Sequence, residues 1–459
     1  MKITVHLGGR QPRPIVGPGN LDTPMMGTMS RFDAAISSDY PVRPPRRRPT
    51  WGAVMHALVH TLHRHLWQRI SYRWRRYALF RATALAAPRP SPNATPALPV
   101  IVAGALRSAS GLGQSARLCH DALHHSGLDV YGVDLTSALM QPPDLPNFAF
   151  ADGRAIEGPG ILILHVNSPL IPLAMLHLGR RLVRNKRVIG YWAWELPYVP
   201  ADWRHGVPFV HEIWAPSAFA AAAIKPIANG HPIHVMPHPV ALARETQALQ
   251  YRNVHDPFTV LTVFNMGSSL ARKNPCAAID AFRRAFRDDP STRLIVKYLN
   301  AGLFPGGVTL LQAACHGASN IVLMGDTLSS SGIEALYDEA DVVISLHHSE
   351  GFGLVIAEAM CRGIPVVATN WSGNVDFLNA ETGMPVGYGL VPAFDQQHTY
   401  DHPDMVWAEA DVDAAAAALQ ELRSNPGLRR RLQASALAVA TQLFSPDGYA
   451  RRVRQLCHV

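Results

Sequence analysis

The sequence is poor in cysteine, and its cysteines are not spaced as in a disulfide framework or a zinc site. Five cysteines are scattered along 459 residues without a C-x-x-C pair. This usage is typical of a reducing compartment, so we expect a cytoplasmic protein. Long apolar runs are also lacking, because nowhere do about 18 apolar residues follow one another, and residues 1–16 have no signal-peptide core. The sequence predicts neither secretion nor a transmembrane span.

Acidic residues are scarce at the N-terminal end, which makes the charge of the chain uneven. Residues 1–95 contain 15 Lys and Arg against three Asp, a surplus of +12, whereas the remainder has 27 against 31, or −4. A partner of opposite charge is therefore expected at this segment and not at the body of the protein.

The same N-terminal segment divides into two parts by composition. Residues 1–50 are rich in Pro, Gly and Arg without a sustained period, which predicts a poorly ordered segment. Residues 51–95 are predicted to form a basic amphipathic helix followed by a Pro-rich linker. A helix over 51–85 with interspersed arginines and aromatic rings fits two alternatives. In the first alternative it lies on an anionic membrane surface, at the inner face of the cell membrane. In the second it packs on the body of the protein.

Beyond residue 95, short Val- and Ile-rich runs alternate with helical patterns, which predicts parallel strands joined by crossover helices. The strands predicted in a first domain, residues 96–240, are Val100–Ala103, Leu128–Val133, Ile161–Val166, Arg187–Trp192, Glu212–Ala215 and Ile233–Met236. Those predicted in a second domain, residues 241–443, are Phe258–Phe264, Arg293–Tyr298, Ile321–Met324, Val342–Leu346 and Pro365–Ala368. A last helix, residues 444–459, is expected to return to the first domain. The pattern predicts two doubly wound α/β domains with a ligand crevice at the carboxyl ends of the strands.

A glycine-containing turn after the strand Val342–Leu346 is the first candidate site. Gly351 and Gly353 permit close backbone approach, and the N–H groups that open the following helix can face a polar ligand. Glu350 lies on the turn and Glu358 two helical turns later. Two carboxylates in one crevice suit hydrogen bonds to vicinal sugar hydroxyls.

Paired cations after the strand Phe258–Phe264 form the second candidate site. Arg272 and Lys273 precede Asn274 and Pro275, which are suited to the N-cap and first position of a helix. Two cations beside a helix N-terminus can hold a diphosphate.

Together these segments resemble the retaining glycosyltransferases of family 4, whose GT-B fold has two Rossmann-like domains facing across a cleft. The segment from Glu350 to Glu358 is similar to the family's E-x7-E pattern with its internal G-F-G, and Arg272-Lys273 is similar to its R-K segment. The resemblance extends from about Val100 to the C-terminus. The segment Trp407-Ala408-Glu409 is similar to that of mannosyltransferase-like members, which favours GDP-mannose as donor.

The resemblance implies transfer of a hexose from a nucleotide-diphosphate sugar to a glycan or lipid-linked glycan, with retention of configuration, as in polysaccharide biosynthesis. It implies that Glu358 binds the donor ribose, Glu350 contacts the donor sugar, and Arg272 and Lys273 neutralise the departing diphosphate. The donor-binding residues expected on this basis are Gly111, Gly113, Arg272, Lys273, Glu350, Gly351, Phe352, Gly353, Leu354 and Glu358. The cations then replace a metal, so we expect no metal. We also expect no cofactor beyond the nucleotide sugar and no nucleic-acid partner.

A glycine loop after the first strand leaves an alternative open. Gly111 and Gly113 resemble the family's loop that approaches the donor phosphates, but with Asp134 they also satisfy the dinucleotide pattern G-x-G-x-x-A. The dinucleotide turn follows its strand directly, whereas seven residues, Gly104 to Ser110, intervene here. An NAD-dependent oxidoreductase is thus the second hypothesis, and a nucleotide-sugar epimerase of the same fold is a third.

Side chains at strand ends in the first domain are candidates for the reacting sugar and the acceptor. His165 ends a strand and is predicted to contact the donor sugar or acceptor, by similarity to a histidine the family often has there. Trp194 and Glu195 follow another strand and could stack on and hydrogen-bond an acceptor, or belong to a buried aromatic cluster. Asp411 and Asp413 form the only D-x-D and are expected to open a helix.

Overall fold

The computed structural model describes residues 80–240, 256–400 and 404–459. By its contacts the chain divides into two compact units, Met1–Gln68 and Arg69–Val459, and all described residues belong to the second. The predictions for residues 1–50 and for most of 51–95 therefore lie outside the described residues. Of the predicted amphipathic segment, residues 80–86 are described and are helical.

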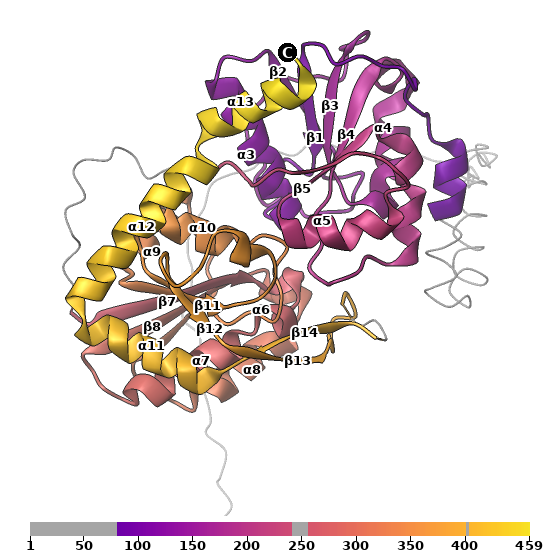
Figure 1. The fold of residues 1–459 in the computed structure, drawn as a ribbon. Helices are drawn as coiled ribbons and strands as arrows, with labels where there is room; N and C mark the ends of the chain where they lie inside the picture. The colour runs from indigo at the N-terminus through magenta and orange to yellow at the C-terminus, as the bar shows by residue number, and fades with distance from the viewer. Residues whose placement is uncertain (1–79, 241–255, 401–403) are drawn as a thin grey trace, which may run out of the picture. The chain divides into compact units, whose positions relative to one another are not determined.

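The N-terminal domain is built on a six-stranded parallel sheet with the order β2-β1-β3-β4-β5-β6 (Figure 1). Its strands are β1 Val100–Gly104, β2 Val130–Asp134, β3 Gly160–His165, β4 Lys186–Tyr191, β5 Glu212–Ala215 and β6 Ile233–Val235. The helices α3 Gly111–His125, α4 Ile171–Val183 and α5 Ala218–Ile224 connect them. Every residue of β1 and β3 is buried, because helices cover both faces of the sheet, as the unbroken apolar runs of these strands predict.

The C-terminal domain repeats this plan with the strand order β12-β11-β10-β7-β8-β9. Its strands are β7 Phe258–Asn265, β8 Thr292–Leu299, β9 Ile321–Met324, β10 Val342–Ser345, β11 Val366–Thr369 and β12 Met384–Val386. Its helices are α6 Leu270–Lys273, α7 Pro275–Phe286, α8 Gly306–Cys315, α9 Ser330–Glu339, α10 Leu354–Met360, α11 Val412–Ser424 and α12 Pro426–Phe444. The prediction of two doubly wound α/β domains is confirmed, and each predicted strand is present with ends shifted by at most two residues.

Three strands were not predicted, and all lie between α10 and α11. Besides β12, they are β13 Tyr388–Pro392 and β14 Val406–Ala410, which pair antiparallel outside both large sheets. Residues of β13 are mostly exposed, so this strand lacks the apolar pattern that marks a buried one. Trp407 and Glu409 of the segment that resembles mannosyltransferases lie on β14.

The last helix, α13 Pro446–Cys457, packs on the N-terminal domain (Figure 1). Tyr449, Ala450, Val453 and Cys457 join the cluster of buried residues around α3. The Tyr449 hydroxyl donates to the Cys119 thiol at 3.4 Å. The chain thus crosses from the first domain to the second and back.

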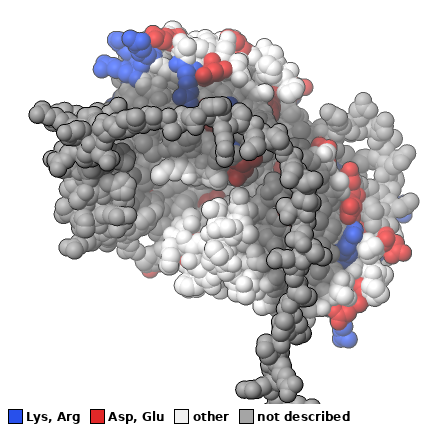
Figure 2. Space-filling view, turned by 180° about the vertical axis from the view of Figure 1, so that it is seen from behind, with Lys and Arg blue, Asp and Glu red and all other residues white. Residues whose placement is uncertain are grey.

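Charge on the described surface is mixed. In Figure 2, Lys and Arg gather at the upper edge, over the N-terminal domain, and a broad area below, over the C-terminal domain, has neither sign. In this domain the stretch from Tyr298 to Gly325, which includes α8 and β9, contains no Lys, Arg, Asp or Glu. Among the helices of the described ranges, none combines the length and apolar character needed to cross a bilayer.

Candidate active site

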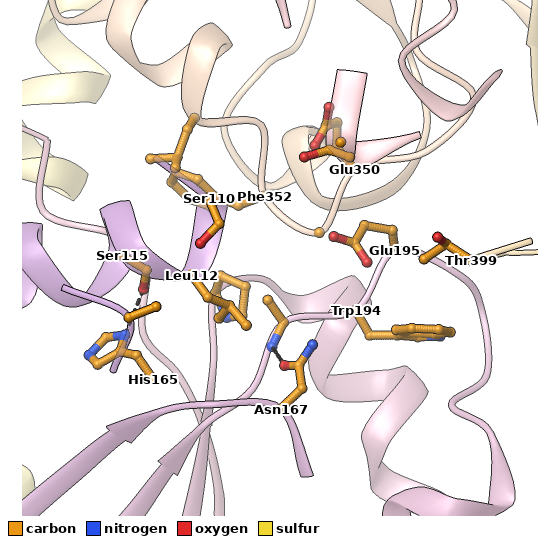
Figure 3. Close-up of a pocket in the computed structure, with 18 of the residues that line it drawn as sticks. Ser110, Leu112, Ser115, His165, Asn167, Trp194, Glu195, Glu350, Phe352 and Thr399 are labelled. Atoms are coloured by element: carbon orange, nitrogen blue, oxygen red, sulfur yellow. Dashed lines mark hydrogen bonds between the residues drawn. The ribbon is translucent and has the colours of Figure 1, made fainter. Parts of the chain in front are cut away.

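The strand orders create a topological switch point in each domain, where chain connections leave in opposite directions. In the first sheet β1 lies between β2 and β3, and in the second β7 lies between β8 and β10. Ligands of doubly wound sheets bind at the carboxyl ends of such strands. A cleft of about 510 Å³ is lined by residues from both switch points (Figure 3).

The cleft collects most of the site residues predicted from the sequence. Those that line it are Gly111, His165, Trp194, Glu195, Arg272, Lys273, Glu350, Gly351, Phe352, Gly353 and Leu354. Figure 3 shows Trp194 and Glu195 entering from the N-terminal domain and Glu350 from the C-terminal domain. Gly113 and Glu358 are not among the lining residues.

Glu350 is held by the turn between β10 and α10. Its backbone N–H donates to the Ser372 hydroxyl at 2.8 Å, and its carbonyl accepts from the Gly373 N–H at 2.9 Å. Gly353 has φ +99° and is the N-cap of α10, a left-handed conformation that favours glycine. A Cβ at Gly351 would lie 3.3 Å from the Trp194 carbonyl oxygen, so the glycine allows the two domains to approach closely here.

The Glu350 carboxylate bridges both predicted diphosphate ligands. Oε2 lies 3.1 Å from Nη1 of Arg272, and Oε1 is bound by Nζ of Lys273. Burial alone would raise the pKa of Glu350, but Lys273, Arg272 and His347 outweigh it and lower the pKa to about 2. Burial lowers the pKa of Lys273, an effect that the Glu350 carboxylate opposes. The cleft therefore holds a buried carboxylate between two cations.

The R-K segment is held by backbone atoms of the opposite loop. Nη1 of Arg272 donates to the Ser349 carbonyl at 2.8 Å, and the guanidinium is 3% exposed. Lys273 is the last residue of α6 and Asn274 follows it in the left-handed region, with φ 47°. Asn274 is the N-cap of α7 and Pro275 its first residue, as predicted, but the Asn274 side chain makes no capping bond.

Glu358 lies in α10 and is turned toward α9. Its Oε2 accepts from the Tyr337 hydroxyl at 2.8 Å, and the Arg362 guanidinium stacks on the Tyr337 ring at 4.5 Å. Burial raises the pKa of Glu358, although Tyr337 and Arg362 act in the opposite direction. One carboxylate oxygen is thus engaged by a neighbouring helix.

The glycines of the predicted phosphate loop have different surroundings. Gly111 opens α3 at the cleft, and an added Cβ there would have no atom within 4 Å. A Cβ at Gly113 would lie 2.5 Å from the Ser108 carbonyl oxygen, so this glycine lets the preceding loop pack on the helix. Both glycines lie within α3, beyond a loop, and Asp134 is engaged by the Thr136 hydroxyl at 2.5 Å. This geometry does not favour the NAD-dependent oxidoreductase.

His165 belongs to a buried polar cluster at the wall of the cleft. Its Nδ1 lies 2.7 Å from the Ser115 hydroxyl, which also lies 3.2 Å from Nδ1 of His238, and its ring stacks on Tyr191 (Figure 3). Its Nε2 has no hydrogen-bond partner among the described residues. Burial, with His238 nearby, lowers the pKa of His165 well below its usual value, so the ring is neutral near pH 7.

The sequence left two roles open for Trp194, an acceptor contact and membership of a buried aromatic cluster. Its position fits both, because it lines the cleft and its ring packs edge-on against that of Trp203 at 5.3 Å. Glu195 lies beside it with its carboxylate in the cleft (Figure 3). Asp411 caps α11 by accepting from the Ala414 N–H at 3.0 Å, and Asp413 lies in its first turn. The D-x-D is thus a helix start.

Several cleft residues were not identified from the sequence. On the N-terminal side they include Leu139, Gln141 and Asn167, and on the C-terminal side Thr399 and Tyr400. Thr399 and Tyr400 follow β13 in a polar stretch without a recognisable period, so no sequence signal pointed to them. Only the return of the β13–β14 hairpin toward α6 brings them to the cleft.

A comparison with known families identifies the chain. The model of family 4 glycosyltransferases in conflict systems matches residues 221–453, just over half of the sequence. The chain belongs to this family. The matched residues of this family 4 chain include the R-K segment and the turn of Glu350 and Glu358.

One curated relative and three solved structures show what this family 4 chain is similar to. The D-inositol 3-phosphate glycosyltransferase of Segniliparus rotundus is 32% identical over 120 residues, 26% of each chain. The match thus spans about a quarter of that relative's length. Sucrose-phosphate synthase of Thermosynechococcus elongatus aligns with 16% identity and a TM-score of 0.56, over 79% of this chain and 98% of that one.

Two further structures have the same fold. A glycosyltransferase from Rickettsia africae aligns with 15% identity and a TM-score of 0.55, over 78% of this chain and 96% of that one. HepE of Anabaena, solved with UDP and glucose, aligns with 14% identity and a TM-score of 0.53, over 78% and 99%. The predicted GT-B fold of two Rossmann-like domains is thereby confirmed.

Proposed function

We propose that this protein is a hexosyltransferase that moves a sugar from a nucleoside diphosphate to a hydroxyl of a glycan or lipid-linked glycan. The observation that carries the proposal is the convergence of Arg272, Lys273 and Glu350 in a cleft between two switch points. Membership of the family 4 glycosyltransferases supports it.

Arg272 and Lys273 are proposed to hold the diphosphate of the donor. The Glu350 carboxylate offsets one of their two positive charges. An incoming diphosphate supplies a second anionic partner for the same cations, whose side chains are largely buried. Stabilisation of the departing diphosphate by fixed cations lowers the barrier to transfer and leaves no role that requires a metal ion.

Glu350 is then proposed to contact the donor sugar and Glu358 the donor ribose. Tyr337 binds one carboxylate oxygen of Glu358, so we assign the ribose hydroxyls to the other oxygen. His165 is proposed to approach the reacting sugar, and Trp194 with Glu195 to receive the acceptor. Gly111, which opens α3 and lines the cleft, is proposed to face the donor phosphates.

Mannose is our candidate for the transferred hexose, and transfer with retention of configuration is our candidate for the stereochemistry. Both rest on the resemblance of Trp407-Ala408-Glu409 and of the E-x7-E pattern to family members. The solved HepE complex contains UDP and glucose, so a uridine donor is tested alongside. We propose that the enzyme is cytoplasmic and that residues 51–85 hold it at an anionic membrane surface.

The test combines a ligand panel with two variants. Thermal shift is measured with UDP-, GDP- and dTDP-sugars, because a ligand that binds only the folded state raises its stability. With the donor that gives a shift, Arg272→Ala and Glu350→Ala should lower transfer at least 100-fold, of the order lost with one transition-state contact. EDTA should leave the rate unchanged.

Arg284→Ala is the matched control, because Arg284 forms exposed ion pairs with Asp280 and Asp413 on α7 and α11. It should transfer sugar as the wild type does. Full activity of either cleft variant overturns the assigned roles. Product formed without any acceptor would instead identify an epimerase.

A further inference from the structure

The R-K segment lies on a helix that is too short to be stable by itself. α6 has four residues, Leu270–Lys273. A single helical turn is unfavourable in isolation, because the first turn fixes several dihedral angles for one hydrogen bond. Its N-cap, Ser269, is fully buried and has φ 69°, which is strained for a residue with a side chain. Contacts from elsewhere must hold this turn in place.

Those contacts come from the segment that follows β13. Asp395 is fully buried, and its Oδ1 accepts from the Ser269 hydroxyl at 2.8 Å. The same hydroxyl oxygen accepts from the Arg272 N–H at 3.1 Å. Gln397 accepts from the Leu270 N–H at 2.7 Å and donates to the Met266 carbonyl at 2.9 Å. Asp395 and Gln397 therefore bind both the cap and the first N–H of α6.

The same carboxylate also sets the position of Tyr400. Oδ2 of Asp395 accepts from the N–H groups of Thr399 at 2.9 Å and Tyr400 at 3.1 Å. The Gln397 N–H also donates to Oδ1, at 3.0 Å, so the buried carboxylate has four donors, is fully satisfied and holds its partners rigidly. One side chain thus links the α6 cap to the backbone at Tyr400.

Tyr400 in turn contacts the Arg272 guanidinium and the opposite domain. Its ring lies under the guanidinium carbon at 5.2 Å and 5.6 Å from the Trp194 ring. Burial, with the Glu195 carboxylate nearby, raises the pKa of the Tyr400 hydroxyl well above its usual value, although Arg272 acts in the opposite direction. An Arg stacked on an aromatic ring keeps its plane fixed while its N–H groups stay free to bind anions.

We propose that Asp395 and Tyr400 are positioning residues that hold α6 and the Arg272 guanidinium in the orientation that receives a diphosphate. This inference rests on the proposed function. Neither residue needs to touch the ligand, because Asp395 acts through the Ser269 cap and Tyr400 through the face of the guanidinium. The loop between β13 and β14 is therefore part of the donor site, although the hairpin lies outside both sheets (Figure 1).

Binding of inorganic pyrophosphate, UDP and GDP by the full chain, measured calorimetrically, tests the proposal. Tyr400→Leu removes the ring and should weaken binding of each probe that the wild type binds by about tenfold, the magnitude of a buried cation–π contact. Tyr400→Phe keeps the ring and should bind within about twofold of wild type. Leu390→Ala, at an exposed position of β13, is the control and should bind as wild type does.

A double-mutant cycle separates positioning from a general loss of structure. In an Arg272→Ala background, Tyr400→Leu should cause no further loss, because its effect passes through Arg272. Asp395→Asn is the second variant, and its melting temperature shows whether it is folded. Asp395→Asn should also weaken pyrophosphate binding by about tenfold. If Tyr400→Leu fails to fold, Asp395→Asn replaces it in the test.

The outcomes distinguish a failure of the positioning role from a failure of the proposed function. If the wild type binds none of the three probes, the proposed function is overturned together with the inference. If the wild type binds and folded Tyr400→Leu binds equally well, only the positioning role is overturned. The same holds if Tyr400→Leu weakens binding by the same factor with and without Arg272.

Discussion

Glu350 controls the charge balance of the cleft. Its carboxylate is 8% exposed and lies between two cations, so each protonation state of this one residue changes the net charge of the buried cluster. The ionised carboxylate offsets one of the two positive charges of Arg272 and Lys273. This compensation predicts a dependence of stability on pH.

The pKa of Glu350 is lowered from 4.5 to about 2 in the folded protein. A lowered pKa means that the ionised carboxylate stabilises the fold, so its contribution is complete above about pH 4.5 and is lost as the pH falls toward 2. We expect wild type to be more stable than Glu350→Gln at pH 6, by roughly 2–3 kcal/mol. The difference should shrink between pH 5 and pH 2. Urea unfolding at each pH measures it, and a difference independent of pH would contradict the assignment.

At the scale of an element, the N-terminal half of α3 contains two glycines with different surroundings. Gly113 is packed under the loop from β1, where a Cβ would lie 2.5 Å from one carbonyl oxygen and 2.6 Å from another. Gly111, two residues earlier, faces open space. Substitution of Gly113 therefore tests the close packing of the loop on α3, whereas substitution of Gly111 tests helix propensity alone.

Gly113→Ala should destabilise the protein by about 1–3 kcal/mol, because backbone atoms cannot move aside cheaply. Gly111→Ala is its matched control and should be neutral or stabilising by up to about 1 kcal/mol, since the added methyl group meets no atom and reduces the entropy of the unfolded chain. Chemical denaturation of both variants checks the contrast. Equal effects of the two substitutions would show that the loop does not press on α3.

At the scale of the whole molecule, the cleft lies entirely within the compact unit Arg69–Val459. The excess positive charge belongs to the N-terminal segment instead. Residues 1–79 contain 13 Lys and Arg against three Asp. We therefore expect donor binding and attraction to anionic surfaces to reside in different parts of the chain.

Deleting residues 1–79 should leave nucleoside-diphosphate affinity within about twofold of the full chain, because the cleft residues are all retained. Co-sedimentation with phosphatidylserine vesicles should be lost, since each Lys or Arg near an anionic surface contributes about 1 kcal/mol. Deleting residues 1–50 alone should preserve vesicle binding through 51–85. If the longer deletion still sediments with vesicles, the membrane surface lies on the body of the protein.

The sequence by itself determined the two sheets, because parallel strands buried on both faces leave continuous Val- and Ile-rich runs, as in β1, β3 and β7. It also indicated which strand ends lie at the cleft, since Arg272, Lys273 and Glu350 lie in the segments that follow β7 and β10. These features are local and therefore readable along the chain.

Tertiary structure alone decided which partners those residues meet. The pairing of Glu350 with Arg272 and Lys273 joins positions 77 and 78 residues apart, and the Asp395–Ser269 bond joins positions 126 apart. The turning of Glu358 toward Tyr337 and the return of Tyr400 to Arg272 likewise depend on packing between elements. No periodicity in the sequence records such contacts, because they arise only when the C-terminal domain and its hairpin are folded.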